Sequence, residues 1–492
     1  MSTEKRVLAF DFGASSGRAI MGIFDGETIR LEEIHRFENT PVKMCGTLYW
    51  DLPRLFHEVK TGLVKAAKSG GFDSLAVDTW GVDFGLIGRD GRLLELPVHY
   101  RDSRTDGMLD EAFSRLDRER FYKITGNQFM EINTVFQLLS LKLKRPHILK
   151  NADTLLLMPD LFGYLLTGKK RAELSIASTT QMLNAVNKSW SETVFGSLGL
   201  PRRILPDIAM PGAVLGELSE DICKELDIPP AKVATVCGHD TQCAAAAAPT
   251  EEEDFIFVSC GTWSLFGTET SEPIISEASQ RLNITNEIGF GGKTTFLKNI
   301  IGLWLIQESR RQFRREGREL SFADLEKLAL ECEPFACFID PDDPVFVPAG
   351  NIPERVREYC KKTGQTVPET EGEIMRCIYE SLALKYRMTF GEIKECTGKS
   401  YGTIHLMGGG AKDGLLCKMT ANACNCTVSA GPVEATAFGN IAMQLIASGD
   451  VADLKAARRI IAASGSVKTF TPDCPDEWEQ AYERFVRLTA DS

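Results

Sequence analysis

Two stretches of this chain, half its length apart, share one pattern: a strand, a Gly-x-x-Ser turn and a second strand. The first is "VLAFDFGASSGRAIMGIF", residues 7–24, with Gly13 and Ser16 in the turn. The second is "FVSCGTWSLFG", with Gly261 and Ser264 in the turn. A pattern that recurs at about half the chain length indicates a duplicated fold with two equivalent halves.

Strand-like and helical patterns alternate along the rest of the chain, which is typical of α/β proteins. The strand-like runs include "SLAVDTWGVDFGLI", "TLLLMPDLFGYLL" and "GTIHLMGGG". With 492 residues the chain exceeds one ordinary core, which favours two large domains. An Ala-rich helix ends at Pro249, before an acidic link. We therefore expect one domain over residues 1–249 and another over residues 250–492.

Charge and cysteine content exclude several classes of protein. A formal net charge of -12 disfavours binding to nucleic acid or to an anionic membrane surface. The segment "MSTEKRVLAFDFG" does not resemble a secretory signal, and no apolar run approaches the roughly 20 residues that span a bilayer. The 14 cysteines are scattered without a CxxC pair, and the 6 histidines have no zinc-binding spacing. We expect a cytoplasmic protein with reduced thiols.

The turn "GASSGR" has the composition of an anion-binding site. Backbone N–H groups in a Gly/Ser turn form a concave anion site, and Arg18 adds positive charge. A carboxylate beside a phosphate is repulsive unless a cation lies between them, so Asp11 suggests a Mg²⁺–nucleotide complex. A tight hairpin with an Asp-capped turn explains the same residues without a ligand.

The stretch "GFGGKTT", residues 289–295, resembles a P-loop but lacks its first glycine. The pattern G-x-x-x-x-G-K-[ST] requires glycine at position 287, where this chain has Glu287. We expect a Gly-rich hairpin there, followed by a helix over "FLKNIIGLWLIQESRRQF", residues 296–313.

The stretch "CGHDTQCAAAAA" contains the candidate for a catalytic base. Asp240 and Thr241 precede the alanines, so one of them is expected to be the N-cap of a helix. That structural role needs no catalysis. A helix N-terminus also favours an ionised carboxylate, and such a group can accept the proton of a hydroxyl that attacks a phosphoryl group.

Other polar and Gly-rich stretches have two interpretations each. In "VDTWGVDFG" and "PVHYRDSRTD", Trp80 and Tyr100 could stack on a sugar while the charged residues bind its hydroxyls, or the charges could form a structural network. The three glycines of "HLMGGGAKDG" let a bulky ligand such as adenosine lie against the backbone. The following "GPVEATAFGNIAMQLIASG" begins a helix whose small residues permit close helix packing.

Taken together, these stretches resemble the FGGY carbohydrate kinases over nearly the whole chain. The resemblance is carried by several motifs in order: "DFGASSGR", "DTWGVDF", "YRDSRT", "LMPD", "HDT", "SCGTWSL", "ITNE", "LKNIIGLWLIQ", "GGG" and "GPVEATAFGN". It implies two actin-like, ribonuclease H-like α/β domains around a central cleft. It also implies ATP and Mg²⁺ as cofactors and a small sugar as substrate.

The resemblance implies a role for each matching position. The first ATP-phosphate turn consists of Ala14, Ser15, Ser16, Gly17 and Arg18. The sugar-binding residues are Gly81, His239, Asp240, Thr241 and Asn299, with Asp240 as proton acceptor. The nucleotide-binding residues are Thr262 in the second phosphate turn, Gln307, and Gly409 on the adenosine side. The assignment of Asp11 to Mg²⁺ remains our inference from the chemistry.

The implied activity is transfer of the ATP γ-phosphoryl group to the 1-hydroxyl of a ketose. L-Rhamnulose is the substrate that we expect, and L-fuculose and L-xylulose are alternatives. A non-catalytic sugar or nucleotide sensor on the same scaffold is a further alternative, although such a protein should lack the carboxylate of Asp240. No oligomeric state follows from the sequence.

Overall fold

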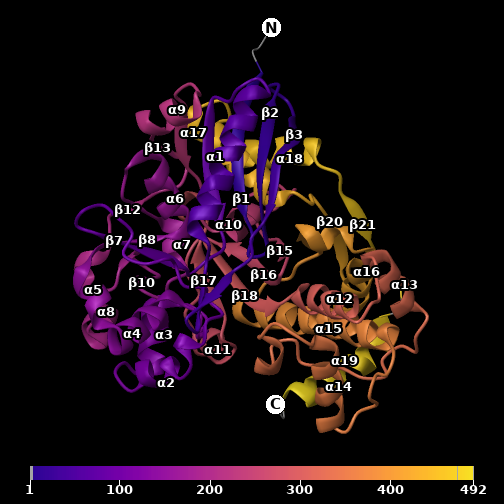
Figure 1. Cartoon of the computed structure of the whole chain (residues 1–492). Coiled ribbons are helices and arrows are strands. Elements are labelled where there is room, and N and C mark those ends of the chain that lie inside the picture. The colour runs from indigo at the N-terminus through magenta and orange to yellow at the C-terminus, as the bar shows by residue number, and fades with distance from the viewer. Residues whose placement is uncertain (1–3, 474, 491–492) are drawn as a thin grey trace. The chain divides into compact units, whose positions relative to one another are not determined.

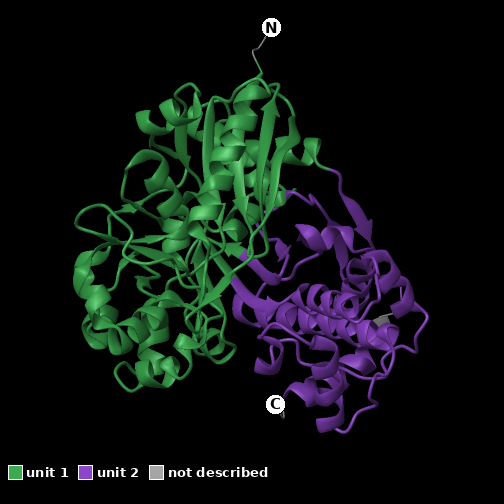
Figure 2. Ribbon diagram, in the orientation of Figure 1, with its two compact units in different colours: residues 1–251, 269–296, 435–465 green, residues 252–268, 297–434, 466–492 purple. Residues whose placement is uncertain are grey.

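The computed structural model describes residues 4–473 and 475–490 (Figure 1). The chain forms two compact units, each assembled from three segments (Figure 2). Unit 1 comprises residues 1–251, 269–296 and 435–465, and unit 2 comprises residues 252–268, 297–434 and 466–492. The predicted boundary at residue 249 divides the sequence at a single point, whereas each of these units combines three separate segments of the chain.

A six-stranded mixed sheet forms the centre of unit 1, with strand order β13-β14-β6-β1-β2-β3. Strands β1, β6 and β14 run parallel, and the pairs β1–β2, β2–β3 and β13–β14 are antiparallel. The bounds are β1 Lys5–Phe12, β2 Ser16–Phe24, β3 Ile29–Glu38, β6 Ser74–Thr79, β13 Ala213–Glu217 and β14 Lys232–Thr235.

The second large sheet has seven strands, in the order β17-β18-β16-β15-β19-β20-β21, with β17 (Thr285–Ile288) at its edge. From β18 to β21 its order corresponds to that of the first sheet read from β3 to β13. Strands β15, β19 and β20 run parallel, and the pairs β15–β16 and β20–β21 are antiparallel, as in the first sheet. The bounds are β15 Ile256–Cys260, β16 Trp263–Thr270, β18 Thr294–Ile301, β19 Thr403–Met407, β20 Thr427–Ala430 and β21 Lys468–Phe470. Strands β16 and β18 also extend into unit 1. The repeated topology agrees with the duplication that the two Gly-x-x-Ser turns indicate.

Unit 1 contains further short strands and most of the helices. Its short strands are β4 Val42–Met44, β5 Thr47–Tyr49, β7 Phe84–Gly88, β8 Ala152–Leu157, β9 Ala172–Glu173, β10 Leu183–Asn184, β11 Ser189–Trp190, β12 Ile208–Ala209 and β17 Thr285–Ile288. Its helices are α1 Leu52–Lys68, α2 Met108–Phe113, α3 Arg118–Thr125, α4 Thr134–Lys144, α5 Pro146–Asn151, α6 Met158–Thr167, α7 Leu174–Ser178, α8 Glu192–Leu198, α9 Glu220–Leu226, α10 Asp240–Ala246, α11 Glu277–Arg281, α17 Ala435–Ser448 and α18 Leu454–Ser464.

The helices of unit 2 are α12 Trp304–Arg315, α13 Phe322–Leu330, α14 Ile352–Lys362, α15 Glu371–Thr397, α16 Gly414–Cys424 and α19 Pro475–Ala490. Thr370 caps α15 through a capping box with Glu373, and Asp413 caps α16 by accepting a hydrogen bond from the backbone of Leu416. The predicted strand, three glycines and helix of "HLMGGGAKDG" are confirmed as β19, Gly408–Gly410 and α16.

The prediction of a helix over residues 296–313 is wrong for residues 296–301. Residues up to Ile301 belong to strand β18, and α12 begins only at Trp304. The β-branched and aromatic residues of "TTFLKNII" favour a strand, and Gly302 separates this strand from the helix. No helix in the described part of the chain is long and apolar enough to cross a membrane.

Candidate active site

The polar residues of unit 1 gather where its three parallel strands end. Asp11 of β1 lies opposite Asp78 of the parallel strand β6 and opposite Arg18 of the antiparallel strand β2. The backbone N–H of Thr79 donates to the carbonyl of Gly238, beyond the end of β14 (2.8 Å). Open α/β sheets bind ligands at this carboxyl edge of the parallel strands.

The turn between β1 and β2 is held by its own backbone and by Asn39. The N–H of Gly13 donates to the carbonyl of Ser16 (2.9 Å), and Nδ2 of Asn39 donates to the carbonyl of Gly13 (2.9 Å). Ser15 at the tip of the turn is exposed, and Ala14 and Ser16 are half-buried. Gly17 leaves no room for a side chain, since a Cβ there would lie 2.3 Å from the ring of Phe37.

Arg18 extends from β2 to Asp11. Its Nη2 donates to Oδ2 of Asp11 (2.6 Å), and the Asp11 side chain is only 8% exposed. The guanidinium therefore lies beside the carboxylate at the base of the turn, where it can also meet a phosphate. The structure thus brings together Asp11 and Arg18, the two charged residues that the sequence analysis assigned to this site.

Asp240 is the first residue of α10, and the N-cap is His239 rather than Asp240 or Thr241. The prediction of the N-cap is therefore wrong by one residue. Oδ1 of Asp240 accepts a hydrogen bond from the backbone N–H of Thr241 (2.6 Å). Burial raises the pKa of Asp240 to about 6, although His239 acts to lower it and Asp11 to raise it further.

His239 joins Asp240 to a buried glutamate, Glu287, which the sequence analysis named only as a mismatch to the P-loop pattern. Nδ1 of His239 lies 2.8 Å from Oε2 of Glu287 on β17, and its Nε2 lies 3.5 Å from Oδ1 of Asp240. Gln242 also donates to Oε2 of Glu287 (2.9 Å). Burial lowers the pKa of His239, but the carboxylates of Glu287, Asp240 and Glu173 together outweigh it, so that the net shift is upward. The only signal in the sequence is the motif "ITNE", to which no role was assigned.

Gly81 adjoins His239. A Cβ at this position would lie 3.4 Å from Nε2 of His239 and 3.4 Å from the side chain of Thr179. Among the predicted residues of unit 1, the structure thus brings Gly81, His239 and Asp240 into one group.

A second missed residue, Asn440, belongs to helix α17 from the far end of the chain. Its Nδ2 donates to Oδ2 of Asp78 (2.6 Å), and its Oδ1 accepts from Nε2 of Gln444 (2.8 Å). Gln444 in turn accepts a hydrogen bond from Ser74 (2.7 Å). The i, i+4 spacing of Asn440 and Gln444 places both on one helix face and was the available signal. The sequence indicated only close packing for this helix.

Asp83 forms the centre of a buried aromatic cluster. Its Oδ2 accepts from the indole N–H groups of Trp50 (2.6 Å) and Trp80 (3.1 Å) and from the backbone of Tyr100 (3.1 Å). Trp50 and Trp80 lie with ring centroids 4.0 Å apart. Burial raises the pKa of Asp83 to about 6 despite the hydrogen bond from Trp50. Trp80 and Tyr100 are each 5% exposed, and the rings of both lie against that of Trp50.

The carboxylates around Asp11 fit a divalent cation. Burial and the neighbouring Asp11 raise the pKa of Asp78 well above its usual value. Oδ1 of Asp78 is buried without a hydrogen-bond partner in the described part of the chain. Carboxylates that disfavour each other's ionisation, one with an unsatisfied oxygen, match the oxygen ligands that Mg²⁺ takes together with water.

In unit 2, predicted residues again lie where parallel strands end. Thr262 occupies the turn after β15, and its carbonyl accepts from the N–H groups of Gly302 (3.1 Å) and Trp304 (3.2 Å). Gly409 follows β19, and a Cβ there would lie 3.8 Å from the carbonyl of Cys260 at the end of β15. The turn, the glycines and the start of α12 therefore meet at one edge of this sheet.

Asn299 and Gln307 occupy different elements on either side of Gly302. Asn299 lies on strand β18 and Gln307 in the first turns of α12, and both are half-buried. Oε1 of Gln307 is buried without a hydrogen-bond partner among the described residues. An unsatisfied buried amide oxygen next to the Thr262 turn is suited to a ligand group that donates a hydrogen bond.

Solved sugar kinases share this fold. A ligand-bound xylulose kinase from Lactobacillus acidophilus superposes with a TM-score of 0.80 at 16% identity, covering 99% of this chain and 98% of its own. Glycerol kinase from Plasmodium falciparum with ADP gives a TM-score of 0.79 at 14% identity, with the same coverage of both chains. The predicted α/β class with two actin-like, ribonuclease H-like units is confirmed.

Family models match both parts of the chain. The N-terminal domain of the FGGY family of carbohydrate kinases matches residues 6–247, and its C-terminal domain matches residues 256–448. The protein therefore belongs to the FGGY family of carbohydrate kinases, as its motifs indicated.

Relatives within this family share more than a third of their residues with this chain. Rhamnulokinase from Bacteroides thetaiotaomicron is 40% identical over 483 residues, which cover 98% of this chain and 99% of the relative. Rhamnulokinase from Enterococcus faecalis is 40% identical, covering 99% of both chains, and that from Bacillus subtilis is 37% identical, covering 94% and 95%.

Proposed function

We propose that this carbohydrate kinase transfers the γ-phosphoryl group of ATP to the 1-hydroxyl of L-rhamnulose, giving L-rhamnulose 1-phosphate in L-rhamnose catabolism. The choice of substrate is supported by the rhamnulokinases that match almost the entire chain. The observation that carries the chemistry is the half-buried Asp240 at the start of α10, in contact with His239.

Asp240 is the proton acceptor in this proposal. The 1-hydroxyl oxygen forms a bond to the γ-phosphorus while the bond to the β–γ bridging oxygen breaks, so that ADP leaves and the hydroxyl proton passes to Asp240. His239, Thr241 and Gly81 surround the position of the sugar. The N-terminus of α10 favours the negative charge that Asp240 must carry before the transfer.

The two Gly-x-x-Ser turns hold the phosphates. Ala14–Arg18 form one turn and Thr262 lies in the other, while Gln307 and Gly409 flank the remainder of the nucleotide. Asp11 and Asp78 are the residues that would hold Mg²⁺ through its waters, and the bound ion would neutralise phosphate charge. Arg18 would exchange its contact with Asp11 for one with phosphate when the nucleotide binds.

A panel of ketoses tests the substrate. ADP formation from MgATP is measured with L-rhamnulose, L-fuculose, L-xylulose, D-xylulose and D-ribulose. We expect kcat/KM for L-rhamnulose to exceed that for every other ketose by at least about tenfold, which corresponds to about 1.4 kcal/mol of transition-state binding. Preference for another ketose would replace the substrate but keep the kinase chemistry. Absence of turnover with all five would favour the sensor alternative.

The substitution Asp240→Asn tests the base. It keeps the size of the side chain but removes the proton acceptor, so kcat should fall by about 10²–10⁴-fold while binding of ATP and sugar stays nearly unchanged. Asp83→Asn is the control, because Asp83 is an even more deeply buried aspartate, 1% exposed against 27% for the Asp240 side chain, and it accepts hydrogen bonds from the aromatic cluster and from Gln137. Full turnover in the Asp240→Asn protein would exclude the assignment.

A further inference from the structure

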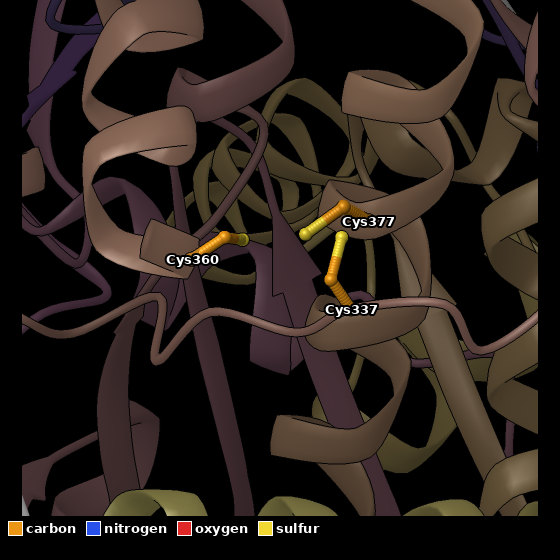
Figure 3. A group of neighbouring side chains, drawn as sticks. All are labelled: Cys337, Cys360 and Cys377. Carbon is orange, nitrogen blue, oxygen red and sulfur yellow. The ribbon is translucent and has the colours of Figure 1, made fainter. Parts of the chain in front are cut away.

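Three cysteines that are far apart in the sequence meet inside unit 2. Cys337 lies in the segment between α13 and α14, Cys360 in α14 and Cys377 in α15. Their Sγ atoms all lie within 4.8 Å of one another, and the side chains converge from three segments (Figure 3). All three are free thiols, with exposures of 3%, 0% and 1%. Sequence reasoning saw only scattered cysteines without ligand spacing.

Hydrogen bonds to the backbone hold these segments together around the sulfurs. The side chain of Gln365 bonds to both the N–H and the carbonyl of Phe338 (2.9 Å each), and its own N–H donates to the carbonyl of Cys360 (2.9 Å). Ser381 accepts from the N–H of Ile339 (3.0 Å) and donates to the carbonyl of Cys377 (2.6 Å). The segment of Cys337 is thus tied to the backbones that carry the other two thiols. A ligand set fixed by such outer contacts loses little entropy when it binds an ion.

The geometry points to a metal site that nothing in the kinase reaction requires, with three sulfur ligands for one thiophilic d¹⁰ ion. Metal–sulfur bonds of about 2.3 Å place the sulfurs about 3.8–4.0 Å apart, so the thiols need to approach by at most about 1 Å. Soft sulfur ligands select monovalent copper or zinc over harder ions. Within the described residues no fourth His, Cys, Asp or Glu joins the group.

Coordination number distinguishes the two ions. Monovalent copper accepts a trigonal set of sulfurs, whereas structural zinc almost always takes four ligands. Because the three cysteines are sealed from solvent, a water has poor access as the fourth ligand. Copper(I) is therefore the better fit. Each S–H that breaks gives one metal–sulfur bond and releases one proton to solvent, with no change in the oxidation state of metal or sulfur.

The full-length protein, reduced and kept under anaerobic conditions, is titrated with Cu(I) against a coloured Cu(I) chelator. A second titration uses Zn²⁺. We expect one equivalent of Cu(I) per chain, proton release, and a higher thermal midpoint, since an ion that binds only the folded state stabilises it. One equivalent of Zn²⁺ in place of Cu(I) would keep the three-sulfur site and change the ion. Uptake of neither ion would overturn the proposal.

The triple variant Cys337→Ala, Cys360→Ala, Cys377→Ala should bind the same ion at least about 100-fold more weakly, because it lacks all three sulfurs. Cys426→Ala is the control, since Cys426 is also buried in unit 2 but its Sγ lies 3.2 Å from the carbonyl of Gly402 and outside the group. Equal binding by the triple variant would overturn the proposal. X-ray absorption of the metal in the unmodified protein gives an answer even if the variant fails to fold, because a first shell without three sulfurs would contradict the site.

Discussion

The charge on Asp240 depends on two neighbouring side chains. Burial disfavours its ionised form, and His239 opposes this effect because Glu287 favours the protonated imidazole. Glu287 therefore acts on the proposed base through His239. A carboxylate with a pKa near 6 is ionised at neutral pH yet remains basic enough to take a proton.

This balance predicts the pH dependence of the kinase. A base works only when it is deprotonated, and Asp240 has a pKa of about 6 in the ligand-free protein. The value of kcat/KM should therefore be constant near neutral pH and fall about tenfold per pH unit well below pH 6. Initial rates between pH 5 and pH 8 measure this limb. An acid limb near pH 4, the ordinary range of an aspartate, would contradict the assigned environment.

Substitution of Glu287 by Gln should move that limb. The amide preserves the shape but removes the negative charge, so the pKa of His239 falls and its positive charge at Asp240 is lost. The acid limb should move upward by about one pH unit. This shift corresponds to a loss of about 1.4 kcal/mol of interaction between the His239 imidazolium and the Asp240 carboxylate.

Glu269→Gln provides the matched control for this substitution. Glu269 is also a buried glutamate of unit 1 paired with a cation, Arg458 (2.6 Å), but it has no contact with His239. Its loss should leave the pH profile in place even if stability falls. A Glu287→Gln profile that coincides with that of the unmodified protein would show that His239 is charged without Glu287.

At the level of elements, helices α10 and α17 approach each other very closely. A Cβ added at Gly439 would lie 1.9 Å from the carbonyl oxygen of Cys243. Around this contact, α10, α17 and strands β6 and β14 share a small core that includes Cys237, Cys243 and Met443. The two cysteines that flank Asp240 are thus packing residues. The contact aligns α17 so that Asn440 reaches Asp78.

The substitution Gly439→Ala should therefore destabilise unit 1. The clash is with backbone, which cannot rotate away, so we expect a loss of about 3 kcal/mol in the free energy of unfolding. Urea unfolding monitored by circular dichroism measures it. Gly196→Ala in α8 is the control: no atom lies within 4 Å of the added Cβ, and the change should be neutral or stabilising by up to about 1 kcal/mol. An unchanged Gly439→Ala protein would mean that the helices can separate at little cost.

At the level of the whole molecule, unit 1 is not one continuous part of the chain. Residues 269–296 contribute Glu287, and residues 435–465 contribute Asn440 and Gln444. A single cut near the middle of the sequence removes both segments from the sheet and helix that carry Asp11, Asp78 and Asp240. The proposed site of unit 1 is therefore complete only in the intact chain.

This organisation predicts the behaviour of a fragment. Residues 1–249 alone lack α17, which covers buried groups of the sheet, so we expect the fragment to show no cooperative thermal transition and to expose apolar surface. Co-expression with residues 250–492 should restore part of the transition. Circular dichroism melts and binding of a hydrophobic dye measure both. A fragment that melts cooperatively at the temperature of the intact protein would show that the second and third segments add little to unit 1.

Local sequence patterns alone predict several elements of this protein without reference to any tertiary contact. The two Gly-x-x-Ser turns, the helix after Asp240 and the glycines at 408–410 depend on turn chemistry and periodicity, which act between near neighbours. The same reasoning failed at residues 296–301, where apolar spacing fits a strand and a helix equally well. Residues that contact a ligand were proposed from motifs, and their roles stay predictions.

Contacts between residues far apart in the sequence could not be predicted from these local patterns. Asn440 meets Asp78 across 362 positions, Glu287 meets His239 across 48, and the three thiols of unit 2 come from separate segments. Such pairs are selected by the order of the strands and by the packing of helices on them, and no local preference of either residue specifies its partner. Composition and turn chemistry therefore determined the class of fold and the proposed phosphate turns. The tertiary structure alone decided which buried groups set the charge of Asp240.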